Sequence, residues 1–364
     1  MRSILVTGGA GFIGSHLVDE LLDHGYDVRV FDSLVAQVHG DAERPPYLSR
    51  DAELLIGDVR DAEAVRRALH GVDGVVHLAA RVGVGQSMYE IAEYTGANSH
   101  GTGVLLQALL DRPVQKLLVA SSMSIYGEGA TAPVEAVERT REDLEARRFE
   151  PRGPNGEVLT PLPTPETKPA ANTSVYALTK YDQERLCLVF GEAYSVPTVA
   201  LRFFNVYGPR QALSNPYTGV LAIFASRLLN HRPPLVYEDG GQRRDFVNVA
   251  DVARACRLAL EQDAADGHAV NVGSGESVTV TEIALKLGKV LGVGREPEVT
   301  GTFRSGDIRH CFADITLARE LLGYRPAVAL EDGMTQLADW LETQTAEDRV
   351  DDATAELVAR GLAR

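Results

Sequence analysis

Short runs of apolar, largely β-branched residues recur along the first two thirds of the chain, separated by longer stretches in which apolar residues have helical spacing. This alternation predicts a parallel, doubly wound α/β sheet. Most of the predicted strands are largely apolar runs, as expected for strands buried on both faces. We expect strands at Ser3–Thr7, Asp27–Asp32, Glu53–Gly57, Gly74–Leu78, Lys116–Ser121 and Thr198–Phe204, and helices at Gly14–His24, Asp61–Leu69, Asn98–Leu110 and about Ser174–Tyr194.

The pattern becomes less regular after Phe204, which predicts a second, smaller α/β lobe that binds the substrate. We expect a loop at Pro209–Gly219, a helix near Val220–Leu229 and a glycine-rich turn at Asp239–Gly241. The larger domain is predicted to comprise residues 1–203 and about 242–270, the smaller lobe about 204–241 and 271–345, and a charged tail with a peripheral helix 346–364.

Residues 129–170 interrupt this organisation. Seven of the chain's 17 prolines lie between Pro133 and Pro169, around the charged stretch Glu135–Arg152 and the turn sequence Gly153–Gly156. This composition predicts a surface insertion that carries one short charged helix, and a lid over the active site is the alternative.

Composition excludes several classes of protein. Hydrophobic residues make up 45% of the 364 residues, enough for a sizeable core, but no apolar run approaches the ~20 residues of a membrane span. The N-terminus enters a strand-like segment without a cleavage site, which argues against a secretory signal. Cys187, Cys256 and Cys311 are far apart and odd in number, which argues against a disulfide framework or zinc site and favours the cytoplasm.

The net charge of −15 makes a nucleic-acid partner improbable, because such a chain repels phosphate backbones. An anionic ligand would need a local cluster of arginines.

Three glycines, Gly8, Gly11 and Gly14, lie between the first predicted strand and the first predicted helix. Glycine there permits a tight turn, close approach of the backbone to a pyrophosphate, and contact between helix and sheet. The helix N-terminus also offers free N–H groups to phosphate. Asp32 ends the next strand, where its carboxylate can hydrogen-bond the adenine ribose diol and would repel a 2′-phosphate. The pattern therefore predicts NAD rather than NADP.

Several segments together resemble the extended short-chain dehydrogenase/reductase family. They are the GxxGxxG spacing, the acidic turn Gly57–Arg60, the segment His77–Ala80, the helix residue Asn98 and the YxxxK pattern of Tyr176–Lys180. The resemblance covers roughly Arg2–Trp340 apart from the insertion, and it implies a Rossmann-type fold with bound NAD. It places cofactor contacts at Gly8, Gly11, Phe12, Ile13, Gly14, Asp32, Asp58, Val59, Leu78, Ala79, Ala80, Asn98, Tyr176 and Lys180.

The same resemblance assigns catalysis to Ser122, Tyr176 and Lys180. Positions i and i+4 share one face of a helix, so the Lys180 ammonium is expected beside Tyr176. That ammonium and the positive nicotinamide ring would stabilise the phenolate and lower a pKa that is about 10 in free tyrosine. Tyr176 would then take a proton from a sugar hydroxyl while hydride leaves the same carbon for NAD. Ser122, at the carboxyl edge of the sheet, would hydrogen-bond the reacting hydroxyl.

Three later segments resemble members of the family that modify nucleotide sugars: Phe203–Arg210, Asp239–Asp251 and Arg304–Asp307. Two guanidinium groups facing a diphosphate would satisfy the need for local positive charge. The resemblance implies substrate contacts from Ser124, Asn205, Arg244, Arg304, Asp307 and Cys311. A buried cysteine that packs as a small hydrophobe is an equal interpretation of Cys311.

The resemblance implies reversible C4 epimerisation of a nucleotide-diphospho-hexose through a 4-keto sugar, with NAD kept bound. The 4-epimerases of dTDP-L-rhamnose are the more similar branch, followed by those of UDP-glucose and UDP-GlcNAc. A 4,6-dehydratase is less favoured, because Met123 and Ser124 occupy positions where dehydratases carry an acid and a base. A catalytically silent NAD-binding regulator is the alternative from another class. The resemblance also implies a homodimer through two helices per subunit, around Val104–Leu110 and Leu186–Phe190.

Overall fold

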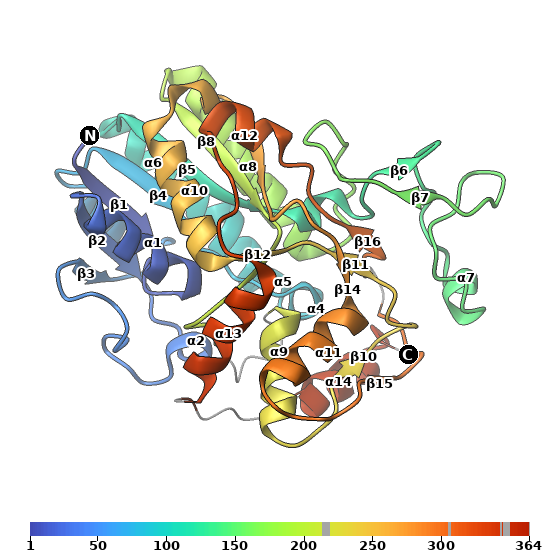
Figure 1. The fold of residues 1–364 in the computed structure, drawn as a ribbon. Helices are drawn as coiled ribbons and strands as arrows, with labels where there is room; N and C mark the ends of the chain where they lie inside the picture. Colours follow the sequence, from blue (N-terminus) through green and yellow to red (C-terminus); the bar gives the residue numbers. More distant parts are fainter. Residues whose placement is uncertain (213–218, 305–306, 343, 345–349, 364) are drawn as a thin grey trace.

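The computed structural model describes residues 1–364 apart from 213–218, 305–306, 343, 345–349 and 364. Its main feature is a parallel sheet of seven strands in the order β13-β8-β5-β4-β1-β2-β3 (Figure 1). Strands β2 and β3 follow β1 on one side, and β4, β5, β8 and β13 follow on its other side, so the order of the strands reverses between β1 and β4. In such sheets ligands bind at this reversal, outside the carboxyl ends of the strands. The predicted Rossmann-type fold is thus confirmed. The strands are β1 (Ser3–Thr7), β2 (Asp27–Asp32), β3 (Glu53–Ile56), β4 (Gly74–His77), β5 (Lys116–Ser122), β8 (Thr198–Phe203) and β13 (Ala269–Val272).

Successive apolar residues of each strand face opposite sides of the sheet, as the two-residue period of a strand requires. In β1, Ile4 and Val6 belong to one buried cluster, and Leu5 belongs to the other. Because both faces are apolar, both are covered by helices. The first face carries α1 (Phe12–Asp23) and α10 (Val249–Glu261), and the second carries α3 (Ala62–Ala68), α6 (Gly101–Asp111) and α8 (Val175–Tyr194).

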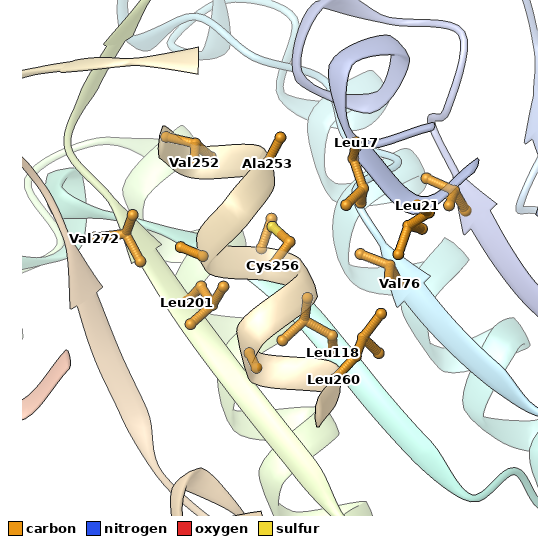
Figure 2. Close-up of a cluster of buried hydrophobic side chains, with 14 of the residues drawn as sticks. Leu17, Leu21, Val76, Leu118, Leu201, Val252, Ala253, Cys256, Leu260 and Val272 are labelled. Atoms are coloured by element: carbon orange, nitrogen blue, oxygen red, sulfur yellow. The ribbon is translucent and has the colours of Figure 1, made fainter. Parts of the chain in front are cut away.

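Helix α10 has the clearest packing on the first face. Figure 2 shows its buried residues directed toward the strands, with α1 alongside. The apolar side chains of α10 recur three or four residues apart, so they form one continuous stripe. The stripe comprises Val252, Ala253, Cys256 and Leu260, and it packs with Leu17, Leu21, Val76, Leu118, Leu201 and Val272.

The structure differs from the predicted domain boundaries in two places. Strands β11 (Arg243–Arg244) and β12 (Phe246–Asn248) pair with strands of the smaller lobe, although the sequence places them in the larger domain. Helix α12 (Thr316–Leu322), predicted in the smaller lobe, buries Ala318 and Leu322 in the core beneath α10. An amphipathic pattern identifies the apolar face of a helix but not the sheet that this face covers.

The smaller lobe has a core of its own between α9 (Val220–Leu229), α11 (Val280–Val290) and α13 (Leu330–Leu341). Short strand pairs surround it, and α14 (Val350–Ala359) follows near the end of the chain. Most of the loop predicted at Pro209–Gly219 lies outside the described residues. The short strands are β9 (Asn205–Tyr207), paired with β12; β10 (Leu235–Val236), paired with β15 (Glu298–Val299); and β11, paired with β14 (Val278–Thr279) and β16 (His310–Cys311).

The insertion and the cofactor side of the sheet also contain short helices, turns and strands. In the insertion, β6 (Thr131–Ala132) pairs with β7 (Thr160–Pro161), and a capping box at Thr140 starts α7 (Arg141–Glu145), which confirms the predicted short charged helix. The insertion projects away from the central sheet in Figure 1. On the cofactor side lie α2 (Ala36–His39), α4 (Val84–Ser87), α5 (Ile91–Tyr94), a π-helical turn (Thr95–His100) that leads into α6, and a 3-10 turn at Met123–Tyr126. A second 3-10 turn, Asp263–Ala265, lies between α10 and β13, where Asp263 is 3.7 Å from Lys116 at the start of β5.

In the described part of the chain, no helix combines the length and the apolar character that crossing a membrane requires. Cys187, Cys256 and Cys311 are all free and buried.

Candidate active site

A cavity of about 620 Å³ lies at the carboxyl edge of the sheet and continues into the smaller lobe. Most of the residues predicted to bind the cofactor or the substrate line it. They are Gly8, Gly11, Phe12, Ile13, Gly14, Asp32, Asp58, Val59, Leu78, Ala79 and Ala80 at one end, Ser122, Ser124, Tyr176 and Lys180 in the middle, and Asn205, Arg244, Arg304 and Asp307 at the other end.

The glycine loop fits tightly between β1, β4 and α1. Gly8 has a φ of +70°, and a Cβ there would lie 2.8 Å from the backbone nitrogen of Ala79. A Cβ on Gly14 would lie 2.2 Å from the carbonyl oxygen of Gly8. Gly11 is different: it is the N-cap of α1 without a side-chain cap, and a Cβ there would approach nothing closer than 3.4 Å. The uncapped N–H groups of α1 therefore face open cavity, as a pyrophosphate site requires.

Two carboxylates lie beyond the loop. Asp32, at the end of β2, accepts hydrogen bonds from the backbone N–H groups of Ala10 at 3.0 Å and Leu34 at 2.9 Å. Asp58 forms an ion pair with Arg60 at 2.7 Å, and hydrogen bonds from Arg60 lower the pKa of Asp58. His39 was not expected from the sequence: its Nε2 lies 3.8 Å from Asp32, and its buried Nδ1 has no partner among the described residues.

Buried polar side chains join the elements next to the cavity-lining segment Leu78–Ala80. The His77 ring lies 2.7 Å from Thr7 Oγ1 and 2.9 Å from Thr102 Oγ1, which ties β1 and β4 to α6. Burial, with a smaller contribution from Lys180, lowers the pKa of His77 to about 3, so the ring is neutral at pH 7.

Asn98 does not line the cavity, in contrast to the prediction that it contacts the cofactor. Its amide accepts from the backbone N–H of Arg81 at 2.7 Å and donates to Thr179 Oγ1 at 2.9 Å. It therefore joins the segment after β4 to the helix that carries Tyr176 and Lys180. The π-helical turn brings it there, and no local pattern in the sequence predicts this turn.

Ser122, Tyr176 and Lys180 meet in the middle of the cavity. Ser122 ends β5, and Tyr176 and Lys180 lie in the first turns of α8, whose N-cap Ser174 accepts from the backbone N–H of Ala177. The Tyr176 hydroxyl is hydrogen-bonded to Ser122. Lys180 Nζ donates to Gln183 Oε1 at 2.7 Å, and Gln183 in turn donates to Thr102.

The protein groups alone do not lower the pKa of Tyr176. Burial raises it, and the hydrogen bond from Ser122 offsets only part of this effect. Burial lowers the pKa of Lys180 to about 8, against the opposing influence of Cys187 and Glu184. The predicted lowering of the tyrosine pKa is therefore not produced by the described protein groups themselves.

A buried ion pair contacts β5, the strand that ends at Ser122. Glu184 of α8 accepts from Ser121 Oγ at 2.6 Å and from two guanidinium nitrogens of Arg202 at 2.6 and 2.9 Å. Arg202 also donates to the Tyr126 hydroxyl at 2.8 Å. Removing one partner of such a pair would leave a buried charge. The sequence does not predict this pair, because Glu184 and Arg202 belong to none of the motifs.

The far end of the cavity is cationic. Arg304 pairs with Asp307 at 2.9 Å, and Arg244 lies 3.8 Å from the same carboxylate. Burial opposes ionisation of Asp307, but the two guanidinium groups outweigh it and lower its pKa. The Arg304 guanidinium also lies over the Tyr237 ring, 4.5 Å from its centroid.

Three buried side-chain oxygens at this end have no hydrogen-bond partner within the described part of the protein: those of Asn205, Gln211 and Gln242. Buried polar atoms are normally satisfied, so these acceptors are available to a polar ligand. Of the three residues, only Asn205 is among those predicted from the sequence. Gln242 lies inside the recognised segment Asp239–Asp251, so the motif contained the signal.

Cys311 does not reach the cavity. It is fully buried in a cluster with Met123 and Phe204, and its Sγ lies 3.9 Å from Thr164 Oγ1 in the insertion. Burial raises the pKa of this thiol to about 12. The structure therefore does not bring Cys311 to the predicted position beside the sugar, and it favours the alternative, a small hydrophobe packed in the core.

The insertion is anchored to the cationic end by buried charges. Arg139 donates to Glu238 at 2.8 Å and to the carbonyl oxygen of Asp307 at 2.6 Å. Arg309, 1% exposed, donates to Glu150 of the insertion at 3.1 Å and to Glu238 at 2.9 Å. The surface insertion thus fixes the segment that carries Arg304 and Asp307. Residues 129–170 are all described by the structure, and none of them lines the cavity.

A phosphate-binding loop, a Ser–Tyr–Lys set and a cationic end within one cavity define an enzyme that uses a dinucleotide to act on an anionic substrate. The uncapped α1 N-terminus fits the pyrophosphate of NAD, and the carboxylate of Asp32 fits its ribose diol. The chain belongs to the NAD-dependent epimerase/dehydratase family, whose model matches residues 4–273.

Similar proteins agree with this assignment. The chain is 37% identical to dTDP-L-rhamnose 4-epimerase of Burkholderia thailandensis over 93% of its own length and 95% of the relative's. UDP-glucose 4-epimerase of Thermotoga maritima, solved with UDP-glucose, superposes with a TM-score of 0.78 at 34% identity, covering 94% of this chain and 99% of the other. The UDP-glucose 4-epimerase of Thermus thermophilus, solved with NAD, gives a TM-score of 0.76 at 31% identity, covering 94% and 100%.

Proposed function

We propose that this protein is a nucleotide-sugar 4-epimerase that keeps NAD bound through the reaction. The observation that carries the proposal is the shared cavity: Ser122, Tyr176 and Lys180 face the same space as the cationic group of Arg244 and Arg304. A diphosphate held by the two arginines would place the attached sugar toward the catalytic residues.

The chemistry of the chain's own residues is proton transfer and positioning. Tyr176 takes the proton of the sugar C4 hydroxyl and later returns it, and Ser122 holds that hydroxyl through a hydrogen bond. Lys180 supplies positive charge that favours the phenolate form of Tyr176. Bound NAD supplies the acceptor and donor for the C4 hydride.

We propose dTDP-L-rhamnose as the substrate, supported by the 37% identity over nearly the whole length of the Burkholderia enzyme. UDP-glucose or UDP-GlcNAc is the second candidate, supported by the structural similarity to UDP-glucose 4-epimerases. The test is incubation of the purified protein with a panel of dTDP- and UDP-hexoses, followed by chromatography of the products. A panel in which no sugar is epimerised refutes the proposal and favours the silent regulator.

A dehydratase would need an acid and a base beside the sugar, in addition to Tyr176. The two residues after Ser122 are Met123 and Ser124, and both line the cavity without a group that exchanges protons near pH 7. We therefore expect dTDP-glucose to yield no 4-keto-6-deoxy product, whose absorbance in alkali is the assay. Catalytic accumulation of that chromophore would contradict the epimerase assignment.

We also propose a homodimer through α6 and α8. Apolar side chains are exposed along these helices: Leu110 is 40% exposed on α6, and Leu178 and Val189 are 54% and 53% exposed on α8. Exposed apolar side chains that gather on one face mark interaction sites. Light scattering at micromolar concentration should give twice 39.3 kDa, and Val189→Asp should shift the mass toward that of one chain. A wild-type mass of a single chain rejects the proposal.

A cytoplasmic location is proposed because the three cysteines are free and buried, as suits a reducing compartment. Fractionation of cells that express the protein from its native sequence tests this, and recovery outside the cytoplasmic fraction contradicts it.

A further inference from the structure

The C-terminal helix α14 is not peripheral, in contrast to the prediction from the charged sequence of the tail. Four apolar residues on it or just after it line the substrate end of the cavity: Val350, Ala353, Leu357 and Leu362. Thr354, on the same face, also lines the cavity, and its hydroxyl lies 3.2 Å from the hydroxyl of Tyr237. Near the start of the helix, Asp351 pairs with both Arg227 and Arg232 at 2.7 Å.

The far end of α14 contacts the cofactor domain. The two terminal methyl carbons of Leu357 lie 3.4 and 3.5 Å from the position that a Cβ on Gly85 would occupy. The Arg360 guanidinium lies 4.4 Å from the centroid of the Tyr89 ring, and Ala363 forms a β-bridge with Arg304. The helix begins next to α9 of the smaller lobe, where Asp351 pairs with Arg227, and ends at the segment after β4, so it contacts both lobes (Figure 1).

We infer that α14 is a wall of the nucleotide-sugar site and that Leu357 is its specificity-determining residue. On one side, Leu357 lies against Gly85, which is two residues before Ser87, and the Ser87 hydroxyl accepts a hydrogen bond from the Tyr176 backbone N–H. On the other side lies the end of the chain, where Ala363 pairs with Arg304. Leu357 thus lines the cavity next to the segment that supports Tyr176 and the segment that carries Arg304, and the inference places the hexose of the proposed reaction against it.

An apolar wall at this position selects the sugar. A hydroxyl turned toward Leu357, Ala353 and Val350 loses its hydrogen bonds to water and finds no acceptor on their side chains, whereas a methyl group gains contact. The wall therefore favours a hexose that presents a 6-deoxy group to it over its 6-hydroxy counterpart. The inference rests on the proposed function only for the identity of the ligand.

The experiment compares four proteins that retain their NAD: the full chain, a variant ending at Gln344, Leu357→Asn, and Val358→Asn as the matched control. Val358 is 53% exposed and outside the cavity, so its substitution changes helix polarity without touching the site. Calorimetry measures the Kd for dTDP-D-glucose and for dTDP-6-deoxy-D-glucose, which differ by one hydroxyl. NAD content and Tm are recorded for each protein.

The truncated chain is expected to keep its NAD and to bind both ligands about tenfold or more weakly, the effect of losing one well-packed apolar contact surface. Leu357→Asn is expected to reduce the preference for the 6-deoxy ligand about tenfold, while Val358→Asn leaves it unchanged. If truncation destabilises the chain, the comparison of Leu357→Asn with Val358→Asn decides.

Unchanged affinity after truncation overturns the inference. Tighter binding also overturns it, because α14 would then block the site rather than form it. The outcome is separate from that of the proposed function: a chain that binds these ligands through α14 but epimerises nothing refutes the epimerase assignment alone.

Discussion

Replacing Lys180 with methionine tests the electrostatics of the catalytic site through folding stability. Lys180 is 3% exposed, and burial lowers its pKa from 10.5 to about 8. Below about pH 8 the ammonium is charged in both the folded and the unfolded chain, and the folded state bears the full cost of burying it. The difference in pKa corresponds to about 3 kcal/mol, at ~1.36 kcal/mol for each tenfold change in proton affinity.

This cost disappears as the pH rises. Between about pH 8 and 10.5 the folded chain binds fewer protons than the unfolded chain, so the free energy of unfolding increases with pH. Methionine has no proton to lose, and the lost hydrogen bond to Gln183 adds an offset that does not depend on pH. Relative to Lys180→Met, the wild type should therefore gain about 3 kcal/mol from pH 8 to 10.5.

The assay is urea unfolding of both proteins, freed of nucleotide and followed by circular dichroism at several pH values. Subtracting one protein from the other cancels the titration of all other groups. A constant difference across this pH range would refute the argument, because it would mean that Lys180 has an ordinary pKa in the folded chain.

Three further predictions concern the site. Tyr176→Phe should retain NAD but lower turnover ~10²–10⁴-fold, as removal of a general acid–base group does, and near-normal turnover would contradict its role. Arg244→Ala should raise KM and leave kcat nearly unchanged, because a phosphate contact is made in the ground state and the transition state alike; a lower kcat at unchanged KM would argue against that contact. Arg139→Met should lower the free energy of unfolding by about 3 kcal/mol and raise KM, since Glu238 and the carbonyl of Asp307 lose a partner. Equal urea midpoints and KM values would show that the insertion does not fix the substrate end.

Much of this molecule follows from local sequence. The strands beneath the site are short, largely continuous apolar runs, and because successive residues of a strand point to opposite faces, such runs predict burial on both faces without any knowledge of their neighbours. Gly8 and Gly14 are recognisable because no other residue fits the backbone contacts that they make. Tyr176 and Lys180 could be paired in advance because a helix fixes the geometry of positions four residues apart.

The rest depends on contacts between distant segments. Nothing in the residues around Asn98 reveals the π-helical turn that directs its amide to Arg81 and Thr179. The Glu184–Arg202 pair joins a helix to a strand 18 residues away, and only the folded chain brings the two charges together.

The tail shows the same limit most clearly. Its charged residues predict a helix at the surface, yet Asp351 and Arg360 attach that helix to both lobes, and its few apolar residues become a wall of the cavity. Helical periodicity shows which residues share a face, but the surface that this face covers depends on how the two lobes approach each other, and that is decided by the tertiary structure alone.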